Sequence, residues 1–142
     1  MFRPLVSALI AIAAASLLAA LPACESQSAE KTVETGSGLV ITELRAGAGE
    51  QPEKTSVVEV HYHGTLEDGT VFDSSVERGQ PARFPLMRVI PCWTEGVQRM
   101  RAGGKSRLTC PPEIAYGARG RPPTIPPNAT LIFEVELLEI VR

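Results

Sequence analysis

The sequence predicts an α+β domain in which a twisted antiparallel β-sheet wraps around one short α-helix. Several segments alternate apolar and polar residues, which is the pattern of strands that bury one face. A single segment, residues 89–100, places apolar residues at helical spacing, and Gly103 and Gly104 follow it. A helix of about two turns is unstable alone, so it must pack on the sheet.

The N-terminus must be set aside before the fold is considered. A short basic start containing Arg3 leads into an apolar run at 5–21, and the run ends in Leu-Pro-Ala-Cys at 21–24. This order is typical of a secretory signal, and its end resembles the bacterial lipobox. We therefore expect residues 1–23 to be a lipoprotein-type signal peptide, with Cys24 lipidated as a membrane anchor. Plain secretion and an uncleaved membrane anchor are the alternatives.

Residues 24–36 are polar and nearly free of large apolar groups, so we expect a flexible tether there. Residues 37–142 remain for one domain with one modest core. Without the leader the chain has 13 basic and 16 acidic residues, a balance that gives no reason to expect nucleic acid. Glu25 in place of aspartate after Cys24 favours the outer membrane, facing the periplasm.

The strands of the first half follow from alternation and turn signals. Residues 39–44 are apolar enough for a strand, and a glycine- and proline-containing loop follows. In the strand at 57–66 one face is apolar and the other is polar, and Asp68-Gly69 then signals a hairpin turn into residues 70–75. The apolar face holds Val58, Val60 and Tyr62, and the polar face holds Glu59, His61 and His63.

The second half completes the sheet around the helix. Residues 76–86 are rich in polar residues and proline, which predicts a loop with an edge strand near 83–86. Pro91 suits a first helical turn, and Trp93, Val97 and Met100 share one helical face. Strands are expected at 105–110 and 131–141; in the last of these, the inward-facing residues are Leu131, Phe133, Val135 and Leu137.

The three cysteines are an odd number for an exported protein. If Cys24 carries lipid, Cys92 and Cys110 remain as a pair in an oxidising compartment. A disulfide closing a loop of this size stabilises a fold by about 3 kcal/mol. Two buried free thiols are the alternative. No metal site is predicted, because neither His61 nor His63 completes a ligand set at a recognisable spacing.

Aromatic residues occur on several different elements of this small domain, and no nucleophile, phosphate loop or metal cluster accompanies them. Asp73 directly follows Phe72 on a hairpin strand, and Tyr116 precedes a proline-stiffened loop. An ordinary aromatic core would explain single members of this set. Together they favour a pocket that holds a substrate in a particular shape. The aromatic residues are Tyr62, Phe72, Phe84, Trp93, Tyr116 and Phe133.

Five motifs carry a resemblance to a known family. They are VHYHG at 60–64, GTVFDSS at 69–75, VIPCWTEG at 89–96, AYG at 115–117 and IPPNATLIFEVEL at 125–137. In order and spacing they resemble the FK506-binding (FKBP) class of peptidyl-prolyl cis-trans isomerases. The match runs from about residue 37 to residue 142. It is similar to the single-domain members and to the catalytic domain of bacterial Mip-like proteins, without the helical dimerisation region of the latter.

The resemblance implies a role for each matching residue. Catalysis is assigned to Tyr62, Asp73 and Tyr116, with the Tyr116 hydroxyl bonding a peptide carbonyl and Asp73 near the twisting amide. Trp93 is expected under the substrate proline ring, and the backbone N–H of Ile90 is expected to hold a second carbonyl. The remaining substrate-binding residues are Phe72, Arg78, Phe84, Val89, Thr124, Ile125 and Phe133.

The resemblance also implies partners and activity. We expect a monomeric isomerase of X–Pro bonds that needs no cofactor, acts on proline-containing polypeptides of the cell envelope, and binds FK506-type macrolides. Ala82 stands where many relatives carry an aromatic residue. An opened wall there would suit the alternative, a proline-recognising binding module or chaperone with little turnover. Arg119 and Arg121 make the loop after Tyr116 basic, which suits either acidic substrate flanks or simple solvation.

Overall fold

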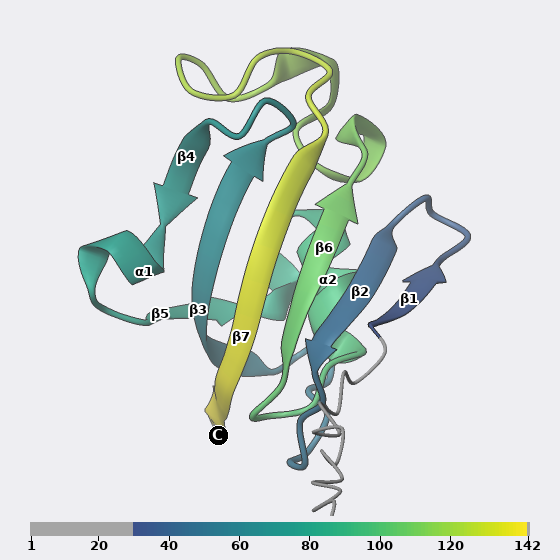
Figure 1. The fold of residues 1–142 in the computed structure, drawn as a ribbon, viewed down its shortest axis with the longest axis vertical. Coiled ribbons are helices and arrows are strands. Elements are labelled where there is room, and N and C mark those ends of the chain that lie inside the picture. The colour runs from purple at the N-terminus through teal and green to yellow at the C-terminus, as the bar shows by residue number, and fades with distance from the viewer. Residues whose placement is uncertain (1–29, 142) are drawn as a thin grey trace, which may run out of the picture.

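The computed structural model describes residues 30–141, and its main element is a seven-stranded antiparallel sheet (Figure 1). The strand order is β1-β2-β6-β7-β3-β4, and β5 pairs with β3 outside this path. Two long central strands, β3 and β7, form the most extensive pairing of the sheet. The strands are β1 (Lys31–Glu34), β2 (Val40–Arg45), β3 (Val57–Leu66), β4 (Val71–Ser74), β5 (Ala82–Pro85), β6 (Lys105–Cys110) and β7 (Leu131–Val141).

The main helix, α2 (Pro91–Gln98), lies on one face of this sheet (Figure 1). Proline in the first turn costs no hydrogen bond, because the first N–H groups of a helix have no partner within it. Its buried side faces β6, and Gly96 permits the close approach: a Cβ there would lie 2.9 Å from Leu108. The short helices are α1 (Ser75–Arg78), η1 (Leu86–Arg88), η2 (Pro112–Ile114) and η3 (Gly117–Arg119).

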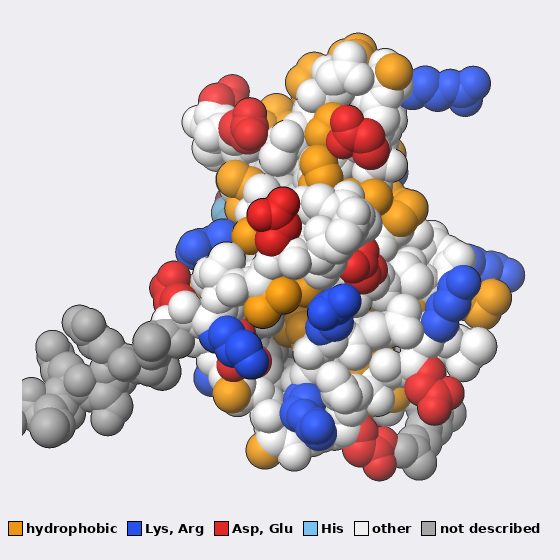
Figure 2. Space-filling model, turned by 90° about the vertical axis from the view of Figure 1, so that its right-hand side faces the viewer, with side chains coloured by type: hydrophobic (Ala, Val, Ile, Leu, Met, Phe, Trp, Pro, Cys, Tyr) orange, Lys and Arg blue, Asp and Glu red, His pale blue; other side chains and the backbone are white. Residues whose placement is uncertain are grey.

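The core lies between the sheet and α2, as alternation along the strands predicted. Every second residue of β3 from Val58 to Gly64 is buried, and β6 and β7 show the same alternation. The expected α+β fold, an antiparallel sheet around one short helix, is therefore confirmed. On the side where β1 lies, basic and acidic side chains are interspersed and hydrophobic ones form small separate patches (Figure 2).

The structure corrects two expectations about the segments that flank the core. The predicted tether at 24–36 is wrong for Lys31–Glu34, which form β1 and pair antiparallel with β2. All four residues of β1 are exposed, so the pairing rests on backbone hydrogen bonds and leaves no apolar pattern. The second is the loop expected at 76–86, which begins with the helix α1. The expected signal peptide and the expected lipidation site, Cys24, lie outside the described residues.

A disulfide joins Cys92 in the first turn of α2 to Cys110 at the end of β6. The two Cα atoms are 5.8 Å apart, and both side chains are fully buried. The structure therefore agrees with the predicted bridge and not with two free thiols. Within residues 30–141, no helix is both long and apolar enough to cross a membrane.

Candidate functional site

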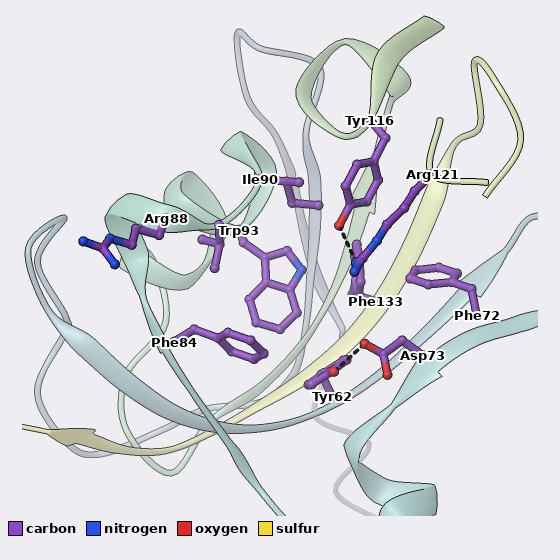
Figure 3. A pocket seen from close by; sticks show the side chains of 11 residues that line it. Tyr62, Phe72, Asp73, Phe84, Arg88, Ile90, Trp93, Tyr116, Arg121 and Phe133 are labelled. Carbon is purple, nitrogen blue, oxygen red and sulfur yellow. Dashed lines mark hydrogen bonds between the residues drawn. The ribbon is translucent and has the colours of Figure 1, made fainter. Parts of the chain in front are cut away.

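A cavity of about 440 Å³ opens between α2 and the curled sheet (Figure 3). Strands β3, β4, β5 and β7 supply its walls, and the segments around Ile90 and Tyr116 supply its rim. Most of the lining is aromatic or aliphatic, with three charged residues among it. The lining residues are Tyr62, Phe72, Asp73, Phe84, Arg88, Val89, Ile90, Trp93, Tyr116, Arg121 and Phe133.

Trp93 is the centre of an aromatic cluster that shapes this cavity. Its ring meets those of Tyr62, Phe84 and Phe133 edge to face, with centroids 5.3 Å, 5.5 Å and 5.3 Å away. Phe72 in turn packs edge to face on Phe133 at 5.4 Å. Such pairs add about 0.5–1.5 kcal/mol each beyond the area they bury. The rings therefore fix one another, and the cavity keeps its shape without a ligand.

A polar network crosses the wall opposite α2. The Tyr62 hydroxyl donates to Asp73 Oδ2 at 2.6 Å, and Arg78 Nη2 donates to the Tyr62 oxygen at 2.9 Å. Arg78 Nη1 completes the triangle by pairing with Asp73 Oδ1. Arg78 does not line the cavity itself, so its expected place among the substrate-binding residues has no support in this geometry; it orients Asp73 and Tyr62 from behind.

This network sets the protonation states of the wall. Burial alone raises the pKa of Asp73, but hydrogen bonds from Tyr62 and Arg78 outweigh it and hold that pKa below its usual value. Burial, together with the bond to Asp73, raises the pKa of Tyr62 above its ordinary value. At neutral pH the cavity therefore presents a carboxylate whose charge is matched by Arg78, and a neutral phenol.

Local sequence explains why these groups meet. Asp73 on β4 pairs with Gly64 on β3, where a Cβ would lie only 2.6 Å from the Phe72 ring. Ser74, the last residue of β4, caps α1 by accepting from the Glu77 N–H. The chain then leaves the helix through Gly79 at φ 72°, a conformation that suits glycine. This single turn brings Arg78 back over Asp73.

The opposite face of β3 holds the same hairpin in place. Ser75 is fully buried; its Oγ accepts from the Tyr62 N–H at 2.8 Å and donates to the Tyr62 carbonyl at 3.3 Å. His61 Nδ1 bonds this Oγ at 3.0 Å, and His63 Nδ1 bonds the Oγ of Ser74 at 2.9 Å. The two histidines thus brace β4 and α1 from outside and do not reach the cavity.

The rim beyond Tyr116 is a tight loop. Arg121 and Ile125 exchange backbone hydrogen bonds at 2.8 and 2.9 Å, and Arg121 Nη1 reaches the Tyr116 hydroxyl oxygen at 3.4 Å. Ile125 is 2% exposed and belongs to the core, whereas Thr124 is exposed. Neither lines the cavity, so their expected contact with substrate has no support in this geometry.

The other sequence-predicted residues meet at one place. The expected aromatic set, Asp73, Val89 and Ile90 all line the cavity. Ala82 does not, and Phe84, two residues later on β5, provides the wall on that side. Arg88 and Arg121 were not predicted as lining residues. The basic loop was the one available signal for Arg121, and nothing local indicated which way Arg88 points.

The chemistry of the cavity is that of binding and orientation. No serine, threonine, cysteine or histidine is among its lining residues. Within residues 30–141, no three His, Cys, Asp or Glu side chains are grouped so as to hold a metal ion. A preformed aromatic cavity with a few fixed polar groups is typical of a ligand-binding site, and its shape suits a small apolar ring beside a polar, hydrogen-bonding group.

Comparison of the sequence with known proteins identifies the family to which the chain belongs. Residues 48–138 match the family model of FKBP-type peptidyl-prolyl cis-trans isomerases. The 22 kDa FKBP-type isomerase of Escherichia coli K12 is 52% identical over 117 residues, covering 82% of this chain and 57% of that protein. FK506-binding protein 1 of Rhizopus delemar is 50% identical over 106 residues, covering 72% and 98%.

Among solved structures, FkpA from Escherichia coli superimposes with a TM-score of 0.75 at 49% identity, covering 80% of this chain and 53% of that one. The chain therefore belongs to the family of FKBP-type peptidyl-prolyl cis-trans isomerases. The expected family and fold are confirmed. The chain spans about half the length of the bacterial relatives that it matches first.

Proposed function

We propose that this protein is a peptidyl-prolyl cis-trans isomerase that binds the proline of an X–Pro bond in the Trp93 cavity. The observation that carries this proposal is the aromatic cavity with Asp73 held on its wall, in a chain of this family. A flat apolar floor suits a pyrrolidine ring, and the polar groups stand where the flanking peptide groups would lie.

The mechanism follows from the barrier of the reaction. Amide resonance opposes rotation by about 18–20 kcal/mol. Water stabilises the planar, charge-separated amide, so transfer of the bond into an apolar cavity weakens the resonance. A site that also binds the twisted amide better than the planar one lowers the barrier selectively. A millionfold acceleration requires about 8 kcal/mol, and none of it requires proton transfer.

Three groups are positioned to hold the peptide. The Ile90 N–H donates to no group among residues 30–141 and lies at the cavity rim, so it is available for the carbonyl after proline. The Tyr116 oxygen already accepts from Arg121, which leaves its own O–H for a peptide carbonyl. Asp73, fixed by Tyr62 and Arg78, faces the rotating amide.

A peptide assay tests the proposal. The isomerisation of an X–Pro tetrapeptide should be accelerated by the purified protein and inhibited by FK506-type macrolides. Trp93→Ala removes the floor and should lower kcat/KM about 10- to 100-fold, the loss expected from one buried apolar ring. Met87→Ala is the matched control, because Met87 is 63% exposed and lies outside the cavity. Macrolide binding without turnover would instead indicate a binding module.

We also propose, from the sequence of the leader, that the protein is anchored by lipid on Cys24 in the cell envelope. The outer membrane is favoured, and the clients would be envelope proteins whose folding is limited by slow isomerisation of X–Pro bonds. Cys24→Ala in the expressing bacterium should move the protein from the membrane to the soluble fraction. Equal membrane retention of the variant and the parent protein would contradict the anchor.

A further inference from the structure

The charges around the cavity do not balance. Its one acidic lining residue, Asp73, is paired with Arg78. Of the basic lining residues, neither Arg88 nor Arg121 forms a salt bridge with any residue in the described range 30–141. The excess charge that a bound peptide meets is therefore positive.

We propose that Arg121 forms a carboxylate-binding subsite for the residue that precedes proline, so that Glu–Pro and Asp–Pro bonds are preferred over their amide counterparts. This inference rests on the proposed isomerase function. It concerns the substrate class and adds a specificity-determining residue that the family motifs do not include.

The direction of the bound peptide places the subsite. In the proposed binding mode the carbonyl that follows proline bonds the Ile90 N–H, which leaves the carbonyl that precedes proline for the Tyr116 hydroxyl. The residue before proline would then lie beside Tyr116. Figure 3 shows Arg88 on the side of Trp93 away from Tyr116, and Arg121 beside Tyr116 with its side chain over Phe133. Arg121, whose Nη1 lies 3.4 Å from the Tyr116 hydroxyl oxygen, is thus the basic lining residue on the side of the preceding residue.

Arg121 is also held in place for this role. Its backbone is fixed by the two hydrogen bonds to Ile125, and its guanidinium lies 5.9 Å from the Tyr116 ring centroid. The single side-chain bond to Tyr116 leaves most of its five N–H donors unused. A planar guanidinium matches the two oxygens of a carboxylate, and one already packed against a ring loses less freedom on binding.

Arg119 separates this proposal from a general effect of a basic loop. It lies two residues before Arg121, is also exposed and does not line the cavity. If the loop acted only through its overall positive charge, removal of either arginine would have a similar effect. If Arg121 contacts the substrate carboxylate, only its removal would matter.

The experiment compares kcat/KM for Ala-Glu-Pro-Phe and Ala-Gln-Pro-Phe peptides, which differ in one charge and not in shape. We expect a Glu/Gln ratio of about two to five, the range of a partly exposed ion pair. Arg121→Gln should bring the ratio to about one, Arg121→Lys should keep part of it, and Arg119→Gln should leave it unchanged. High salt should lower the ratio in the parent protein.

A ratio at or below one in the parent protein, or an unchanged ratio in Arg121→Gln, would overturn the proposal. General effects of the substitution on Tyr116 cancel, because they act on both peptides. If neither peptide is turned over, the isomerase function fails. The same Glu/Gln comparison, made on dissociation constants from NMR titration, then decides the subsite separately.

Discussion

The disulfide between Cys92 and Cys110 makes the sharpest prediction about stability. The two residues are 18 apart in sequence, and a cross-link over such a loop removes about 3 kcal/mol of conformational entropy from the unfolded chain at 25 °C. For a domain of this size, loss of the cross-link should lower the melting temperature by about 13 °C. We expect this loss once the bridge is reduced, and because both cysteines are fully buried, the reductant reaches them only when the fold opens.

The assay is urea unfolding of the oxidised protein with and without a phosphine reductant. The reduced protein should unfold at lower urea with a larger m-value, since its unfolded chain exposes more surface. Activity should fall as well, because the bridge fixes the helical turn that carries Trp93. A Cys92→Ala/Cys110→Ala variant, which should not respond to the reductant, is the control. If reduction changes the unfolding free energy of the parent protein by less than 1 kcal/mol, or mass spectrometry finds two free thiols, the reasoning is refuted.

Three further predictions concern the cavity and its support. Gly64→Ala would place a Cβ 2.6 Å from the Phe72 ring and 3.1 Å from Phe133. The value of kcat/KM should therefore fall, and overpacking should cost about 1–3 kcal/mol of folding stability. Unchanged kinetics would show that these rings are free to move. Ser75→Ala leaves the buried Tyr62 N–H without its acceptor and should cost about 1–3 kcal/mol in urea unfolding, a loss that Val76→Ala at an exposed neighbouring position should not reproduce. The third prediction concerns pH. The pKa of Asp73 lies below its ordinary 3.8, so the carboxyl is ionised above that pH, and the pKa of Tyr62 lies above its ordinary 10.0, so the phenol is protonated below that pH. The value of kcat/KM should therefore be flat from about pH 5 to 9. The lowered pKa of Asp73 also stabilises the fold at pH values above the unfolded pKa, and this contribution should disappear as pH falls through the folded pKa. A step in kcat/KM between pH 5 and 9 would contradict these protonation states.

Three strands that bury one face could be predicted from the sequence to the residue, whereas β2 lies one residue later than expected. Residues 57–66, 105–110 and 131–141 were expected as strands and are β3, β6 and β7. In each of them, burial alternates along the strand, so packing itself imposes the pattern that the sequence shows. By contrast, β1 is exposed along its whole length, and α1 is only four residues long. Neither element requires a periodic sequence.

The site residues could likewise be predicted where they lie on regular elements, and could not be predicted where they lie on a loop. The aromatic residues and Asp73 occupy positions whose direction is set by strands and by α2, so the family motifs indicated where they would meet. Thr124, Ile125 and Arg121 are on a loop, where no period relates a residue to a face. There the backbone pairing of Arg121 with Ile125 decides the outcome, turning Ile125 into the core and Arg121 over the cavity.

The position of Tyr62 links the two faces of β3. Its ring lines the cavity, its hydroxyl bonds Asp73, and its backbone is held by Ser75 on α1. Because α1 also carries Arg78, any shift of Ser75 moves both the donor and the cation that orient Asp73. The hydrogen bond between His61 and Ser75 therefore supports the polar wall from the face of β3 that points away from the cavity. This arrangement explains how a cavity with so few polar groups can keep a carboxylate in a fixed orientation.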